Sequence, residues 1–236
     1  MIVSLIVIVT ILVLAIPSAV IFIPLAMVTG NVGPLYKVTC LIVSAGYRVA
    51  GIHIKVDGRE LVPAHRACIF MANHVSNLDA PALISRLPGR TSAFTKRSVF
   101  KLPIFGFCLK LGEYIPVDRT GDAASAQASV DAAARLLEKG LHITTFVEGK
   151  RSADGIMQLF KKGPFYLAKQ SGAPCIPVSI YGTEKLMAKG SFGIKPGTAH
   201  IIFHAPIYPG DYATREELSE AVRAAIASGL PEWMRG

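Results

Sequence analysis

Charged side chains are scarce in this sequence and absent from its start. Only 17% of the 236 residues are charged, against about 25% in typical soluble proteins. The first charged side chain is Lys37, so the net charge of +9 belongs almost wholly to the residues after an apolar opening. A basic domain joined to an apolar segment favours an anionic membrane surface, where each nearby Lys or Arg contributes about 1 kcal/mol. Nucleic acid is the alternative partner, but no recognition motif is present and the apolar opening would have no purpose.

Cysteine is also rare, and the residues that would support several common chemistries are missing. Cys40, Cys68, Cys108 and Cys175 are far apart and form no CxxC or Cys/His cluster with metal spacing. Cys68 and Cys175 lie in apolar runs, so they are expected to be buried and reduced in a cytosol-facing domain. The absence of HExxH and of G-x-S-x-G argues against a zinc site and a serine hydrolase.

The apolar opening predicts a membrane-embedded helical segment over residues 1–51. Residues 2–27 are almost continuously apolar, which is long enough to cross a hydrocarbon core of about 30 Å. Pro17 and Pro24 should kink or divide this run, and residues 36–51 predict a shorter second helix. The pair forms either a hairpin in one leaflet or a span followed by an interfacial helix. A cleaved signal peptide is the alternative, although no Lys or Arg precedes the run and an h-region usually has about 7–15 residues.

From residue 52 onward, short β-rich runs alternate with helical ones. Residues 122–139 begin with Asp and stop before Gly140, which predicts a helix, and residues 214–228 predict another with two Glu in its first turn. This alternation predicts an α/β domain over residues 52–236, with a mixed, largely parallel sheet flanked by helices. The expected strands are 52–56, 67–71, 91–95, 114–117, 143–147, 175–181 and 199–205.

A histidine and an aspartate lie between an expected strand and an apolar helical stretch. Loops at the carboxyl ends of strands bind ligands in α/β sheets, so His74 is expected to enter a crevice. Asp79 can fold back and accept the proton of one imidazole nitrogen, which leaves the other nitrogen as a base. Two other interpretations remain open: Ser76 and Asp79 fit a capping box, and His74 fits an ordinary loop histidine. Without a protein nucleophile, the pair fits a reaction in which the substrate hydroxyl attacks.

Asn73-His74-x-x-x-x-Asp79 resembles the first signature block of the PlsC-type glycerolipid acyltransferases, the family of 1-acylglycerol-3-phosphate acyltransferases. Three further segments resemble the later blocks of that family in the same order, over about a hundred residues. They are Lys96 to Pro103 with Gly106 and residues 112–119; Phe146-Val147-Glu148-Gly149-Lys150-Arg151-Ser152; and Pro174-Cys175-Ile176-Pro177-Val178.

The resemblance implies a glycerol-3-phosphate acyltransferase-like fold and a role for each matching residue. His74 would be the general base and Asp79 its orienting partner. Guanidinium groups suit a phosphate because they bind it through two N–H groups. The residues expected to bind the glycerol phosphate are Glu148, Gly149, Arg151, Arg119, Lys96 and Lys150. Those expected to shape the acyl or acceptor pocket are Ile176 and Pro177.

The third block departs from the family pattern at two positions. Val147 replaces the usual proline and Lys150 the usual threonine, and in the second block Ser98-Val99 stands where Glu-Leu is common. The extra cation at Lys150 fits a phosphate but also leaves other acceptors open. These are a lyso-ornithine lipid, glycerol 3-phosphate and a lysophospholipid with a larger head group. A catalytically silent membrane protein that binds anionic lipid is the alternative from another class.

The resemblance therefore implies transfer of a fatty acyl group to the 2-hydroxyl of 1-acyl-sn-glycerol 3-phosphate, which gives phosphatidic acid. Acyl-CoA or acyl carrier protein would be the donor and a membrane lysophosphatidic acid the acceptor, with no metal or other cofactor. Because Lys and Arg are absent before Lys37 and frequent after it, the catalytic domain is expected on the cytoplasmic side of the inner (plasma) membrane.

Overall fold

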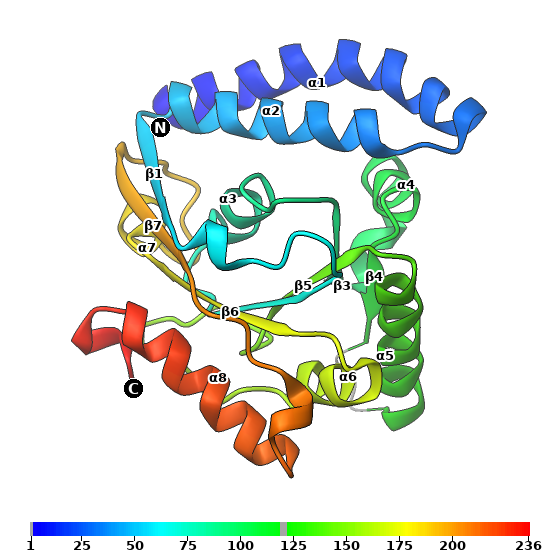
Figure 1. Cartoon of the computed structure of the whole chain (residues 1–236). Helices are drawn as coiled ribbons and strands as arrows, with labels where there is room; N and C mark the ends of the chain where they lie inside the picture. The colour runs from blue at the N-terminus through cyan, green and yellow to red at the C-terminus, as the bar shows by residue number, and fades with distance from the viewer. Residues whose placement is uncertain (1, 119–121) are drawn as a thin grey trace.

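The chain begins with two long helices that lie side by side along one side of the molecule (Figure 1). The structure is a computed structural model and describes residues 2–118 and 122–236. Helix α1 covers Ile2–Thr29 and helix α2 covers Gly33–Val49. Among the described helices, α1 is the one long and apolar enough to cross a membrane, by length and composition, and few of its residues are buried.

Helix α1 is continuous through both of its prolines, so of the two expected outcomes, a kink or a division, the division does not occur. A proline removes one backbone N–H and crowds the carbonyl four residues earlier. The hydroxyl of Ser18 donates to Leu14 O at 2.7 Å, one carbonyl beyond the Val13 O that Pro17 leaves without its helical donor. Such local hydroxyl donors and packing against a neighbouring helix commonly allow proline inside apolar helices.

Within the described residues, seven strands form one sheet in the order β1-β7-β6-β2-β5-β3-β4. Strands β6, β2, β5, β3 and β4 run parallel, while β7 is antiparallel to β6 and pairs in parallel with β1. Each expected strand is present within two residues of its predicted ends, which confirms a mixed, largely parallel sheet. The strands are β1 (Ile52–Asp57), β2 (Ile69–Ala72), β3 (Thr91–Lys96), β4 (Ile115–Val117), β5 (His142–Phe146), β6 (Cys175–Tyr181) and β7 (Gly197–Phe203).

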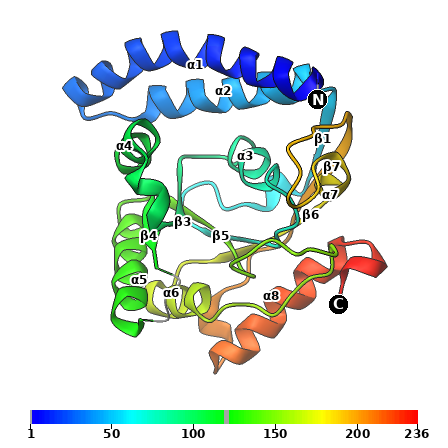
Figure 2. The same cartoon turned by 180° about the vertical axis from the view of Figure 1, so that it is seen from behind.

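Helices cover both faces of the sheet, and each face has its own apolar core (Figures 1 and 2). Alternate residues of a strand face opposite sides: Ile69 and Met71 pack with α5, α6 and α8, whereas Phe70 packs with α1, α2 and α3. The remaining helices are α3 (Asp79–Ile84), α4 (Pro103–Leu111), α5 (Ala123–Glu138), α6 (Gly163–Ser171), α7 (Thr183–Leu186) and α8 (Arg215–Gly229). Short 3-10 turns cover η1 (Arg59–Leu61), η2 (Arg97–Lys101), η3 (Pro209–Asp211) and η4 (Glu232–Met234).

The two helices predicted most directly from the sequence, α5 and α8, begin with side-chain caps. Asp122 accepts hydrogen bonds from Ala124 N and Ser125 N at the start of α5. Thr214 and Glu217 form a reciprocal capping box at the start of α8. These bonds satisfy backbone N–H groups that a helix terminus otherwise leaves without a partner. Both helices therefore start where the cap residues predict.

Candidate active site

The segment that carries His74 leaves the sheet at a position set by Asn73. The Asn73 side chain donates to Ile180 O at 2.8 Å and accepts from Ile180 N at 2.7 Å. This buried amide continues the pairing between β2 and β6 beyond the last residue of β2. Because β2, β5 and β6 are parallel, the loops after them emerge at the same edge of the sheet. His74 therefore enters that edge from a fixed backbone.

The structure brings His74 and Asp79 together. The distance from His74 Nδ1 to Asp79 Oδ2 is 2.8 Å. The same oxygen accepts the backbone N–H groups of Val75 and Ser76, each at 2.7 Å. Because a backbone N–H can only donate, Oδ2 is an acceptor and His74 Nδ1 carries the proton that points at it. In the neutral imidazole with this tautomer, the lone pair is on the other ring nitrogen, Nε2.

Asp79 is fully buried, and its second oxygen has a partner as well. Thr183, which comes after β6, donates its hydroxyl to Asp79 Oδ1 at 2.5 Å. Half of the capping box considered for Ser76 and Asp79 is formed, because Ser76 N donates to the Asp79 carboxylate. The other half is not, because the Ser76 hydroxyl accepts a hydrogen bond from Leu78 N and not from Asp79 N. The carboxylate thus both closes the loop and orients the imidazole.

The imidazole of His74 stacks on the ring of Phe146, with centroids 4.0 Å apart and the planes 21° from parallel. The His74 side chain is 18% exposed, and one face of its ring is covered by Phe146. In the described part of the chain, no serine, cysteine or threonine side chain hydrogen-bonds to this ring. This arrangement fits a reaction in which a bound substrate supplies the nucleophile.

Glu148 holds the backbone of this loop. One of its oxygens accepts from His74 N at 2.8 Å and the other accepts from Gln158 N at 3.0 Å. The side chain is 1% exposed, and burial raises the pKa of its carboxyl, while these two backbone donors act in the opposite direction. Glu148 was expected to line the glycerol phosphate site; its geometry favours a positioning role instead, because both oxygens already bind protein N–H groups.

A second connection joins the loop after β5 to His74. Ser152 N donates to His74 O at 2.8 Å. Between Glu148 and Ser152 the chain turns through Gly149, whose φ of +70° lies in the left-handed region. A Cβ there would also lie 3.1 Å from Lys161 Cγ. The turn therefore favours glycine, and Arg151 directly precedes Ser152, the residue that contacts the histidine loop.

Arg151 has a buried donor without a partner. Its Nη1 is inaccessible to solvent and has no hydrogen-bond acceptor among the described residues. The backbone of Arg151 is held by Lys189, whose Nζ donates to Arg151 O at 3.0 Å. A buried N–H without an acceptor costs about 1–3 kcal/mol. An anionic ligand at this position would supply the missing acceptor.

The other expected cations are less closely placed. Lys96 is exposed at the carboxyl end of β3 and Lys150 is exposed after β5, so both lie at the same edge of the sheet as His74. Neither makes a hydrogen bond to the His74 loop within the described residues. Arg119 lies outside the described residues. Binding of the substrate phosphate by Lys96, Lys150 and Arg119 stays a prediction.

Ile176 and Pro177 lie inside β6, between β2 and β7, and both are buried. Ile176 packs in the core beside Phe70 and Val178. Because both side chains lie in the core, this geometry does not support their expected place in an acyl or acceptor pocket. An apolar run in a central strand predicts burial, but it does not distinguish a core residue from a residue of a pocket wall.

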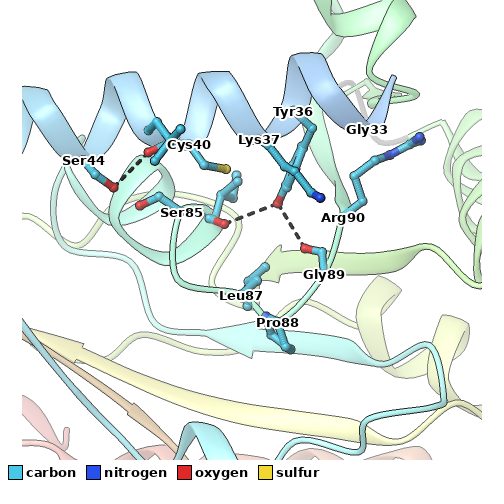
Figure 3. Close-up of a pocket in the computed structure, with 12 residues that line it drawn as sticks. Gly33, Tyr36, Lys37, Cys40, Ser44, Ser85, Leu87, Pro88, Gly89 and Arg90 are labelled. Atoms are coloured by element: carbon cyan, nitrogen blue, oxygen red, sulfur yellow. Dashed lines mark hydrogen bonds between the residues drawn. The ribbon is translucent and has the colours of Figure 1, made fainter. Parts of the chain in front are cut away.

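A hollow of about 490 Å³ lies elsewhere, between α2 and the chain after α3 (Figure 3). Tyr36 crosses it, and the single proton of its hydroxyl is shared between two acceptors, Ile84 O and Gly89 O, each at 3.3 Å. Its walls are mainly apolar, with Lys37 and Arg90 at the rim. No sequence pattern indicated this hollow, because its two sides are about fifty residues apart.

Thr183 was also missed, although its place just after a strand at the catalytic edge was a usable signal.

Comparison with known proteins agrees with this geometry. A family model described as "Acyltransferase" matches residues 53–181. The chain is 33% identical over 175 residues to a 1-acyl-sn-glycerol-3-phosphate acyltransferase of Limnanthes douglasii, covering 74% of this chain and 61% of that protein. It is 29% identical over 219 residues to 1-acyl-sn-glycerol-3-phosphate acyltransferase alpha of Homo sapiens, covering 91% and 76%.

A solved structure is also similar. The crystal structure of the 1-acyl-sn-glycerophosphate (LPA) acyltransferase PlsC from Thermotoga maritima superposes with a TM-score of 0.75 at 27% identity, covering 85% of this chain and 80% of that one. Against several plant relatives the match spans 44–61% of the relative's length. The family match nevertheless covers more than half of the residues, including both members of the His74–Asp79 pair, and the chain belongs to the acyltransferase family.

Proposed function

We propose that this protein transfers a fatty acyl group from acyl-CoA or acyl carrier protein to the 2-hydroxyl of 1-acyl-sn-glycerol 3-phosphate. The observation that carries the proposal is the His74 imidazole, held by a buried carboxylate through Nδ1 and left with Nε2 available. The names of its relatives and of the superposed Thermotoga maritima enzyme support the same acceptor.

In the proposed reaction, His74 Nε2 takes the proton of the acceptor hydroxyl as that oxygen attacks the thioester carbonyl. The new C–O bond forms, the C–S bond breaks, and the proton on His74 passes to the departing thiolate. Asp79 stabilises the imidazolium that exists between these two proton transfers. General-base assistance of this kind is typically worth about 10²–10⁴-fold in rate. His74 and Asp79 are thus the proposed catalytic residues.

The acceptor phosphate is proposed to bind Arg151, whose buried Nη1 lacks an acceptor among the described residues. Lys150 and Lys96, exposed at the same edge, would add positive charge, as would Arg119. Glu148 and Gly149 would act through the backbone, since the first holds His74 N and the second permits the turn toward Arg151.

The hollow beside α2 is the proposed place for an acyl chain. It adjoins the carboxyl end of α3, the helix whose first residue is Asp79. Six helical residues span about 9 Å, so a chain bound near His74 would reach the hollow by running along α3. Its apolar walls suit methylene groups, and Lys37 and Arg90 at the rim suit a lipid phosphate or the bilayer surface.

The α1–α2 pair is proposed to form a membrane-embedded unit, residues 1–51, that places the remaining domain at the leaflet where the lipids reside. Most large apolar side chains of α1 are exposed, including Ile2 at 76% and Val20 at 69%. The distribution of Lys and Arg supports a cytoplasmic catalytic domain at the inner membrane. The acyl donors, which are soluble, would then approach from the cytoplasm.

The test is acyl transfer by the purified full chain in detergent micelles, with lysophosphatidic acid and acyl-CoA. His74→Ala should lose at least about a hundredfold in rate, while His53→Ala, which removes an exposed imidazole from β1, should stay near wild type. Equal rates for wild type and His74→Ala would refute the proposed base.

A panel of acceptors tests the substrate. Lysophosphatidic acid should be preferred over glycerol 3-phosphate, a lyso-ornithine lipid and a lysophospholipid with a larger head group, with acyl-CoA and acyl carrier protein compared as donors. Turnover of another lipid without turnover of lysophosphatidic acid would reject the proposed acceptor. Lipid binding without any transfer by the wild type would instead support a silent lipid-binding protein.

A further inference from the structure

Helix α4 exposes an apolar side that no described part of the chain covers. Ile104 is 81% exposed, Phe107 is 43% exposed and Leu111 is half-buried. Their i, i+3, i+7 spacing places them on one helical face. Gly106 and Leu109 are buried on the other face. A water-facing helix of a soluble domain normally has the opposite arrangement, with polar residues outward.

The orientation of α4 is fixed by close backbone packing. A Cβ at Gly106 would lie 2.1 Å from Phe100 O, so the helix sits directly against the preceding turn η2. Leu102, which joins η2 to α4, is itself 54% exposed. The apolar side is therefore held outward by the fold, because the helix cannot turn it inward without losing this contact.

Cations surround the apolar side. Lys96 and Lys101 precede α4, Lys110 lies in its last turn, and all three are exposed. Two acidic residues near α4 are already paired, Asp118 with Arg97 at 2.6 Å and Glu113 with Arg90. Apolar side chains bordered by Lys are the composition of helices that lie in the plane of an anionic membrane surface.

Helix α4 lies on the same side of the sheet as the α1–α2 pair, next to the end where α2 begins (Figures 1 and 2). Large apolar side chains are thus exposed both on α1 and on the neighbouring α4. We propose that α4 is a second membrane contact, which lies in the interface of an anionic bilayer with Ile104 and Phe107 among the lipids. This requires the membrane position proposed for α1–α2, but it does not depend on the transfer reaction.

Chain order connects this contact to the reaction. Strand β3 ends at Lys96, η2 and α4 come next, and Lys96 lies at the catalytic edge of the sheet. Contact of α4 with the bilayer would hold this edge close to the leaflet, at a second point besides α1–α2. A lysolipid would then reach His74 without leaving the membrane surface.

Tryptophan fluorescence tests the contact directly. The sequence has one Trp, Trp233, so Trp233→Phe provides a background for Phe107→Trp. A matched control is Tyr208→Trp, because Tyr208 is 44% exposed against 43% for Phe107 and precedes η3, which packs with α6 on the other side of the sheet. Both full-length variants are reconstituted with vesicles of phosphatidylcholine and phosphatidylglycerol, with and without brominated acyl chains.

Transfer from detergent-free buffer to vesicles should shift the emission of Phe107→Trp to the blue, and brominated chains should then quench it about twofold or more; Tyr208→Trp should show neither change. Equal quenching of the two variants overturns the proposal. Failure of the full chain to float with the vesicles also overturns it. A blue shift of Phe107→Trp without quenching overturns it as well, because self-association of the protein would then cover the Trp instead of lipid. None of these readouts uses acyl transfer, so a failure of the proposed reaction is distinguished from a failure of the contact.

A second variant measures the effect on turnover. Ile104→Ser with Phe107→Ser should lower the rate with a long-chain lysolipid in vesicles about tenfold, and should leave the rate with a short-chain, water-soluble acceptor unchanged. Equal losses with both acceptors would indicate damage to the site and would contradict a role in membrane contact. Tyr208→Ser is the control and should change neither rate.

Discussion

Replacing Asp79 with asparagine should slow catalysis strongly while leaving the fold and the histidine tautomer in place. Asp79 Oδ2 accepts Val75 N, Ser76 N and His74 Nδ1. Because two of these donors are backbone N–H groups that cannot accept, the asparagine carbonyl must occupy the Oδ2 position. Its amide nitrogen then faces the Thr183 hydroxyl, which can rotate and accept. The variant therefore removes the charge and retains the pattern of hydrogen bonds.

The expected magnitude comes from the missing charge. When His74 becomes an imidazolium, the carboxylate 2.8 Å from its Nδ1 is replaced by a neutral amide. Opposite charges with centres about 4 Å apart attract by about 4 kcal/mol at an effective dielectric constant of about 20. Partial exposure of the His74 ring weakens this value. Since about 1.4 kcal/mol is a tenfold change in rate, kcat should fall about a hundred- to a thousandfold.

The assay is steady-state transfer by Asp79→Asn, with circular dichroism and thermal unfolding to establish that the variant folds. KM for either substrate should change little, because Asp79 is fully buried and touches only protein groups. Thr183→Val is the matched control: it removes the donor to Oδ1 but keeps the His74–Asp79 bond, and should cost less than about tenfold. A folded Asp79→Asn variant with kcat within tenfold of wild type would refute the electrostatic reasoning.

Three further outcomes are expected from the same structure. Arg151→Lys should raise KM for the phosphate acceptor about tenfold with a smaller change in kcat, because an ammonium cannot bind a phosphate through two N–H groups; steady-state kinetics measure this. Burial raises the pKa of Glu148, so its contribution to stability is complete below the ordinary glutamate pKa of about 4.3 and is lost as pH rises through the raised value. The excess unfolding free energy of wild type over Glu148→Gln, from denaturant titrations, should therefore shrink as pH rises above about 4. Burial also raises the pKa of the Cys68 thiol to about 11 and that of Cys175 to about 12, so mass spectrometry of the alkylated native protein should show modification at half-buried Cys108 well before either.

Each of these outcomes has a result that would contradict it. An unchanged KM in Arg151→Lys would place the phosphate elsewhere. A stability difference for Glu148→Gln that is constant with pH would show that its protonation does not differ between the folded and unfolded states. Rapid native alkylation of Cys175 would contradict its complete burial in β6.

The sequence predicts the sheet well because strand burial is a local pattern. Strand β2 is apolar along its length and β6 is apolar except at Ser179, as expected of parallel strands covered by helices on both faces. The His74–Asp79 pair could also be predicted, since the two residues are five positions apart on either side of one helix start. In both cases the deciding contacts involve neighbours in the chain or residues with a clear hydrophobic pattern.

Prediction was weaker where a residue's partners are distant in the chain. Glu148 matches a block expected to bind substrate, yet its oxygens accept from His74 N, 74 residues earlier, and from Gln158 N. Thr183 is 104 residues from Asp79 and carries no motif of its own. Hydrophobic periodicity and block spacing indicate that such residues are near the site, but they do not indicate whether an oxygen faces a ligand or a backbone N–H group.

The blocks of the sequence are linked physically as well as by their order. The loop after β2 is bonded to β6 through Asn73, to the loop after β5 through Glu148 and Ser152, and to the start of α7 through Thr183. Three strand ends therefore fix one imidazole from different directions. Because these strands are parallel neighbours, a shift of one residue in any of them would move its loop by about 3.3 Å and break bonds that are now about 2.8 Å long. The fixed position of each block relative to its strand is thus a geometric requirement of the His74 site, and not only a feature of the binding of substrate.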